Sequence, residues 1–92
     1  MEDLRREVEW FAKQMERRLK ENDHKPGWKH DSLSSLVVRL DEEVSKIWSN
    51  IALFEGESDY EEIYEDAIDL GNFAMMVADV AAERAWRDDN GE

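Results

Sequence analysis

Apolar residues recur along the chain at steps of three and four, the spacing of one face of an α-helix, and nothing alternates with a period of two. The first such stretch predicts a helix over about residues 2–21. The second predicts a helix from about residue 33 to Phe54, and the third a helix that follows Ser58. The three stripes consist of Leu4, Val8, Phe11, Met15 and Leu19; of Leu33, Leu36, Val37, Leu40, Val44, Ile47, Trp48 and Ile51; and of Tyr60, Ile63, Ala67, Leu70, Ala74, Val77 and Ala81.

The stretch NDHKPGWKHDS separates the first two predicted helices. Pro26 lacks a backbone N–H and Gly27 permits turn conformations, so the helical pattern breaks there. Asp31 and Ser32 both have side chains that accept a hydrogen bond from a helix N-terminus. We expect one of them to cap the second helix.

The second connection is expected to contain both a helix end and a helix start. Gly56 suits the end of the second helix, because glycine adopts the left-handed conformation found there. Ser58 followed by Glu61 has the spacing of a capping box and is expected to begin the third helix. The polar tail, residues 87–92, is expected to fray.

These elements predict an all-α fold, a single domain over residues 1–92 built as an antiparallel bundle of three main helices. The short second connection makes the second and third helices antiparallel neighbours. The third helix is apolar on much of its circumference between Ala67 and Ala82, which calls for contacts on several sides. A chain of this size buries only roughly 60% of its unfolded surface. We therefore expect oligomerisation to complete the core, as a homodimer or a dimer of dimers.

The charge balance narrows the class of partner. The sequence holds 24 acidic and 12 basic residues, a formal net charge of −12, whereas a nucleic-acid partner requires clustered Lys and Arg. The sequence has no cysteine, which excludes disulfides and thiolate metal sites. No apolar run approaches the roughly 20 residues of a membrane span, and charged residues follow Met1 where a signal core would lie. We expect a cytoplasmic protein that binds neither nucleic acid nor membrane.

Acidic residues interrupt the apolar faces of the second and third predicted helices. Asp66 and Asp69 are three residues apart and share a helix face, and antiparallel packing brings Glu43 opposite them. Three carboxylates in a partly dry cleft repel one another unless a cation neutralises them. Oxygen ligands of this kind suit Mg²⁺ or Mn²⁺. The pattern predicts a divalent metal site formed by these three residues.

A purely structural role is the alternative for the same residues. In this alternative Asp69 forms a buried ion pair with Arg39 or Lys46 and holds no metal. Asn72, on the same helix, would then be a polar residue that fixes the register of an oligomer, as a buried Asn does in coiled coils.

Three segments, NDHKPGW, RLDEEVSKIW and EDAIDLGNFAMMVAD, resemble the MazG-like all-α nucleoside triphosphate pyrophosphohydrolases, especially small archaeal and phage members. The resemblance covers about residues 10–80. The family pattern is a Glu-x-x-Glu on one helix and a Glu-x-x-Asp on the next, which together hold Mg²⁺. Matched position by position, Glu43 falls on the first Glu, Asp66 stands at the third position and Asp69 falls on the Asp.

Lys46 stands at the second Glu position and departs from the family pattern. A protonated ammonium does not coordinate a metal, and the substitution changes the local charge by about two units, which weakens divalent binding. Asp66 also has a shorter reach than the family's Glu. Either fewer ligands hold the metal, with Glu42 or Glu62 helping, or the fold persists without catalysis.

The resemblance implies an Mg²⁺- or Mn²⁺-dependent hydrolase that splits a nucleoside triphosphate into monophosphate and pyrophosphate, with activity weakened or lost through Lys46. Glu43, Asp66 and Asp69 would be its catalytic and metal-binding residues. The alternative is a catalytically silent helical oligomer with a structural or binding role. Side-chain chemistry suggests cationic and polar contacts to phosphate and an aromatic contact to a base: Lys25, Trp28, Lys29, Arg39, Lys46 and Asn72.

Overall fold

The computed structural model describes residues 3–52 and 56–89 of the chain. Within these ranges it contains three α-helices and no strand: α1 (Arg6–Glu21), α2 (Leu33–Asn50) and α3 (Tyr60–Asp89). The predicted all-α class is confirmed. None of these helices combines the length and the apolar character that a membrane crossing requires.

The two ends of α2 are set by different local features. Ser32, one of the two candidate caps, accepts a hydrogen bond through its side chain from the backbone N–H of Ser35 at 3.1 Å. The helix ends at Asn50, because Ile51 has an extended backbone with φ −91° and ψ 122°. The predicted extension to Phe54 is therefore wrong, and Phe54 itself lies outside the described residues.

The start of α3 differs from the predicted capping box. The side chain of Asp59 accepts the hydrogen bond from the backbone N–H of Glu62 at 3.2 Å. The Ser58 hydroxyl instead accepts a hydrogen bond from the backbone N–H of Ala52 at 2.8 Å, which closes the end of α2. Gly56 has φ +94°, a left-handed conformation suited to glycine, within the connection. At its other end α3 is helical through Asp89, inside the segment for which fraying is expected, and residues 90–92 are outside the described part.

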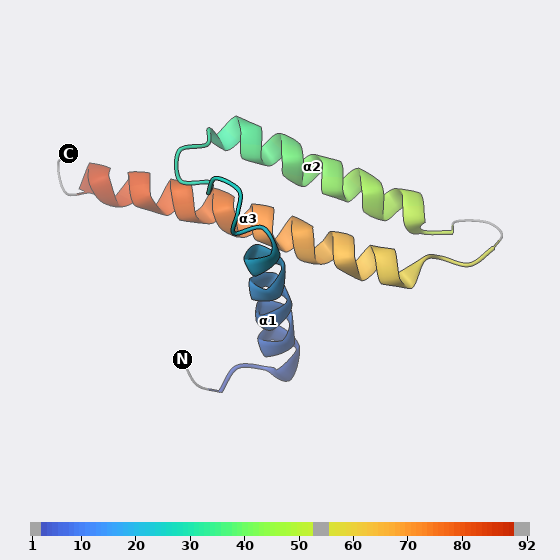
Figure 1. Cartoon of the computed structure of the whole chain (residues 1–92). Helices are drawn as coiled ribbons and strands as arrows, with labels where there is room; N and C mark the ends of the chain where they lie inside the picture. Colours follow the sequence, from blue (N-terminus) through green and yellow to red (C-terminus); the bar gives the residue numbers. More distant parts are fainter. Residues whose placement is uncertain (1–2, 53–55, 90–92) are drawn as a thin grey trace.

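Helix α2 lies along α3, and the chain runs in opposite directions in the two helices (Figure 1). The buried apolar residues of the described chain are Leu36 of α2 and Ile68 and Val80 of α3. Helix α1 begins at Arg6, four residues later than the expected start near residue 2, and contains no buried residue.

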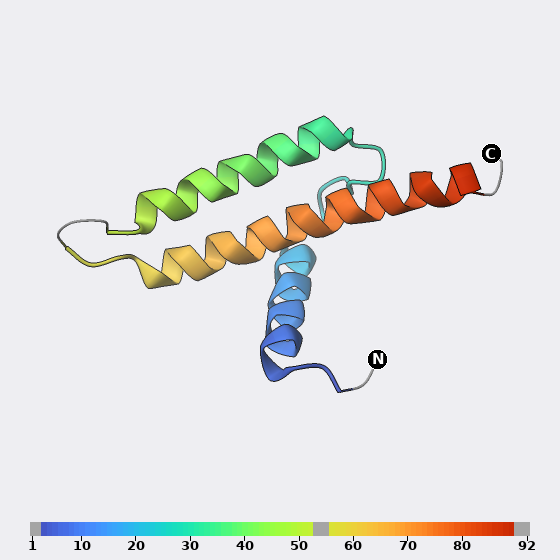
Figure 2. The same cartoon turned by 180° about the vertical axis from the view of Figure 1, so that it is seen from behind.

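The C-terminal end of α1 lies at the middle of α3, and the N-terminal end of α1 points away from α3 in both views (Figure 2). Gly71 makes this approach possible, because a Cβ atom at that position would lie only 2.6 Å from the Phe11 ring. The buried Asn72 side chain donates a hydrogen bond to the backbone carbonyl of Met15 at 3.2 Å. Asn72 thus fixes α1 on α3 within one chain.

Several large apolar side chains remain exposed around this contact. Val8 and Trp10 of α1 and Tyr64 of α3 are 48%, 47% and 43% exposed, and the Trp10 and Tyr64 ring centroids lie 6.4 Å apart. Trp10 and Tyr64 pair at the junction of α1 and α3. In the apolar stripe of α1, Val8 is exposed, and Phe11, Met15 and Leu19 are only partly buried.

Candidate metal centre and adjoining pocket

Glu43 of α2 and Asp66 and Asp69 of α3 come together between the two helices. Each offers one carboxylate oxygen, and the three oxygens all lie within 4.8 Å of one another. Asp66 and Asp69 share a face of α3 because they are one helical turn apart. The opposite chain directions of α2 and α3 bring Glu43 beside them. We call these three residues the carboxylate cluster.

Burial makes the carboxylate cluster electrostatically costly. Glu43 and Asp66 are only 6% and 7% exposed. Burial raises the pKa of Glu43, and the nearby Lys46 ammonium partly opposes this rise. Burial also raises the pKa of Asp69, against the opposing charge of Arg18. The Glu43 Oε1 atom is buried and has no hydrogen-bond partner, so the cluster holds an acceptor that a cation would satisfy.

Lys46 points toward the cluster. Its Nζ atom lies 3.1 Å from Glu43 Oε2, and its side chain is 59% exposed. The hydrogen bond with Glu43 raises the pKa of Lys46, which keeps the ammonium charged. Asn50, one turn beyond Lys46 on α2, was not predicted as a site residue, yet its side chain donates a hydrogen bond to Asp66 Oδ2 at 3.4 Å. The other expected helpers, Glu42 and Glu62, are exposed and do not belong to the cluster.

The ion-pair partner of Asp69 is Arg18, neither Arg39 nor Lys46 as the structural alternative expected. Arg18 Nε lies 2.9 Å from Asp69 Oδ1, and Arg18 Nη2 also pairs with Glu65. Arg39 lies instead over the Phe73 ring, 5.1 Å from its centroid. The expectation was wrong because Arg18 belongs to α1, and the apolar stripes of α1 and α3 do not predict where α1 crosses α3.

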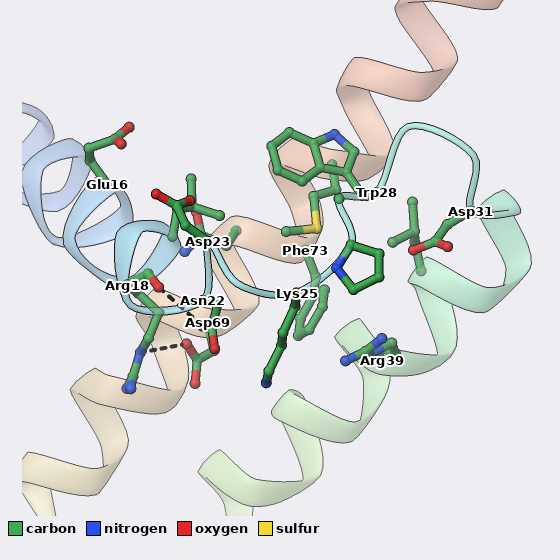
Figure 3. A pocket seen from close by; sticks show the side chains of 16 residues that line it. Glu16, Arg18, Asn22, Asp23, Lys25, Trp28, Asp31, Arg39, Asp69 and Phe73 are labelled. Atoms are coloured by element: carbon green, nitrogen blue, oxygen red, sulfur yellow. Dashed lines mark hydrogen bonds and ion pairs between the residues drawn. The ribbon is translucent and has the colours of Figure 1, made fainter.

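A pocket of about 530 Å³ adjoins the cluster and shares Asp69 with it. It lies between the end of α1, the segment 22–31, α2 and α3 (Figure 3). Four of the six residues that the sequence suggested for substrate contact line this pocket, namely Lys25, Trp28, Arg39 and Asn72. Lys46 and Lys29 do not. Arg18 and Phe73, which the sequence analysis did not nominate, also contribute to its wall.

Asp79 of α3 holds the segment 22–31 in place over the pocket. Its Oδ2 atom accepts hydrogen bonds from Trp28 Nε1 at 2.9 Å and from Lys29 Nζ at 2.6 Å. These two bonds, that of Lys29 first, lower the pKa of Asp79. Lys29 is therefore engaged in fixing the loop, and Trp28 presents its ring to the pocket with its N–H already satisfied.

Comparison of the chain with protein-family models, with curated proteins and with solved structures found no match. The geometry of the carboxylate cluster and of the pocket is therefore the evidence on which a function rests.

The raised pKa of Glu43 predicts how stability depends on pH in a chelator. A carboxyl group whose pKa is higher in the folded state stabilises the fold when protonated, so stability is lost as pH rises from the ordinary value of 4.5 through the folded value. Replacing Glu43 by Gln removes this loss. We expect Glu43→Gln to raise the melting temperature by about 2 to 6 °C at neutral pH and to bring no gain in acid. Thermal melts across the pH range measure the difference. Glu42→Gln, at an exposed neighbouring position, is the control, and an equal gain in that variant would contradict the assignment.

Proposed function

We propose that the protein is a divalent-cation-dependent nucleoside triphosphate pyrophosphohydrolase, which converts a nucleoside triphosphate into a monophosphate and pyrophosphate. The observation that carries the proposal is the carboxylate cluster with its unpartnered Glu43 oxygen, which adjoins a pocket at Asp69. The wall of this pocket contains cationic and aromatic side chains together with the acidic Glu16, Asp23 and Asp31. The resemblance in sequence implies the same reaction.

The oxygen ligands of Glu43, Asp66 and Asp69 suit Mg²⁺ or Mn²⁺. Such a cation, when bound, supplies neutralisation of phosphate charge and activation of water. The buried position of Glu43 and Asp66 strengthens the electrostatic hold on the cation, because the local dielectric constant is lower than that of water. The three carboxylates therefore serve as ligands, and the lack of a direct partner for Glu43 Oε1 fits that role.

The pocket supplies the remaining contacts to a nucleotide. Lys25 and Arg39 give positive charge for phosphate groups, and Trp28 and Phe73 give aromatic surface for a base. Its volume of about 530 Å³ falls within the range of small-molecule sites. Its junction with the cluster at Asp69 would set the phosphates of a bound nucleotide next to the cation.

The second candidate is a catalytically silent helical oligomer. The two ion pairs of the cluster favour it, because Lys46 and Arg18 already offset part of the negative charge without a metal. The exposed Val8, Trp10 and Tyr64 surface supports oligomerisation in either case. The two candidates differ in whether the cluster binds a divalent cation and whether any nucleotide is hydrolysed.

The enzyme proposal is tested with a panel of ribonucleoside and deoxyribonucleoside triphosphates, Mg²⁺ and detection of released pyrophosphate. We expect release with at least one nucleotide. Asp69→Asn should lower that rate by at least ~100-fold, since a misplaced cation costs several kcal/mol of transition-state stabilisation. Asp41→Asn, an exposed acidic residue of α2, should keep the rate. Absence of release with every nucleotide, or an active Asp69→Asn variant, would favour the silent oligomer.

Lys46 provides a direct electrostatic test of the cation site. Lys46→Glu removes a charge 3.1 Å from Glu43 and adds a fourth carboxylate, so Mg²⁺ and Mn²⁺ affinity should rise by about tenfold or more. Lys46→Gln should give a smaller gain, and Lys13→Glu on α1 makes the same charge change away from the cluster. Calorimetric titration compares the four proteins. Equal gains for Lys46→Glu and Lys13→Glu would show that only net charge matters.

We propose in addition that a second copy covers the apolar surface of Val8, Trp10 and Tyr64, giving a homodimer or a dimer of dimers. Among the described residues only three apolar side chains are buried, which is few for a stable core, and another chain would cover the exposed part of α1. Sedimentation at micromolar concentration should therefore give a dimer or a tetramer, and Trp10→Glu should shift the population to smaller species. A compact native monomer of 10.9 kDa would contradict this assembly.

A further inference from the structure

Arg18 links three parts of the molecule. It belongs to the last turn of α1, it pairs with Asp69 of the carboxylate cluster and with Glu65 of α3, and it lines the pocket. Figure 3 shows its side chain directed toward Asp69, with the ion pair drawn as a dashed line. Asp69 thus belongs to the carboxylate cluster and also pairs with Arg18, a cationic residue of the pocket wall.

The contact between Arg18 and Asp69 is held by charge more than by a directed bond. Their Nε and Oδ1 atoms are 2.9 Å apart, yet the buried Nε–H makes no hydrogen bond of acceptable geometry. The other two nitrogens of the guanidinium have separate partners, Nη2 with Glu65 and Nη1 with Glu21 at 3.6 Å. Loss of the Asp69 contact therefore leaves the group with two carboxylate partners, one of them on α3.

A divalent cation on the carboxylate cluster changes this balance. It withdraws negative charge from Asp69 and repels the guanidinium, so the attraction that holds Arg18 falls. The planar guanidinium matches phosphate oxygens better than an ammonium does, since it donates two parallel hydrogen bonds. The pocket that Arg18 lines is where the proposed function expects phosphate groups.

We propose that Arg18 is a phosphate-binding residue whose Nε edge pairs with Asp69 when no cation is bound. A divalent cation on the cluster releases this edge, which then binds phosphate in the pocket. This inference rests on the proposed function for both the cation and the phosphate ligand. It makes Arg18 a competitor of the metal and a partner of the substrate. Its removal therefore has opposite effects on the two affinities.

The test uses Arg18→Gln and calorimetric titration of the full chain, first with Mn²⁺ alone and then with inorganic pyrophosphate at saturating Mg²⁺. We expect Mn²⁺ affinity to rise by about tenfold, as a competing charge is lost. Pyrophosphate affinity should fall by about tenfold, as one charge-assisted contact is lost. Arg17→Gln is the matched control. Arg17 also pairs with Glu65 on the same turn of α1, but it neither contacts Asp69 nor lines the pocket.

The results distinguish a failure of the Arg18 proposal from a failure of the proposed enzyme function. The inference is supported if Arg18→Gln raises the Mn²⁺ affinity and lowers the pyrophosphate affinity while Arg17→Gln changes both affinities only slightly. Equal shifts in the two variants, or a loss of both affinities in Arg18→Gln through a loosened α1, overturn it. Mn²⁺ binding that is lost in Asp66→Asn but unaffected by Arg18→Gln overturns the inference alone. Absence of saturable Mn²⁺ binding in both the native chain and Arg18→Gln overturns the proposed function as well.

Discussion

The burial of carboxylates between α2 and α3 is the constraint on which the other polar contacts depend. Two acidic side chains, Glu43 and Asp66, lie almost out of water in a helix pair with few buried apolar residues. Charge in such a place requires partners. Lys46 and Asn50 of α2 contact Glu43 and Asp66, respectively, and Arg18 of α1 pairs with the neighbouring Asp69. Among the described residues, polar contacts from α1 and α2 therefore gather on residues 65–72 of α3, whereas Asp79, farther along α3, binds Trp28 and Lys29.

The sequence predicts those features that depend on helical period alone. The approach of Glu43 to Asp66 and Asp69 follows from one turn of spacing on α3 and from the reversal of the chain after α2. The direction of Lys46 follows in the same way. Helix ends are less regular, since a single hydrogen bond decides them. The Ser58 hydroxyl binds the N–H of Ala52, so the adjacent Asp59 caps α3 instead.

The path of α1 across α3 could not be read from either apolar stripe. It depends on Gly71, whose missing side chain admits the Phe11 ring, and on the amide of Asn72, which binds the Met15 carbonyl. Neither residue carries a periodic signal that distinguishes it from others on α3. The ion pair of Arg18 with Asp69 is a consequence of this crossing, and so is the pocket wall that Arg18 forms. Helical periodicity therefore predicts the carboxylate cluster but does not predict its partner on α1, Arg18.

The two cations beside the cluster act under different physical conditions. Lys46 reaches Glu43 from solvent, with 59% of its side chain exposed, so water and salt screen much of its effect. Arg18 is 27% exposed and lies between Asp69, Glu65 and the pocket, where screening is weaker and geometry is fixed. A charge change at position 46 therefore adjusts the field around the cluster. A change at position 18 alters the ion pair of Asp69 and the pocket wall together, because one guanidinium takes part in both.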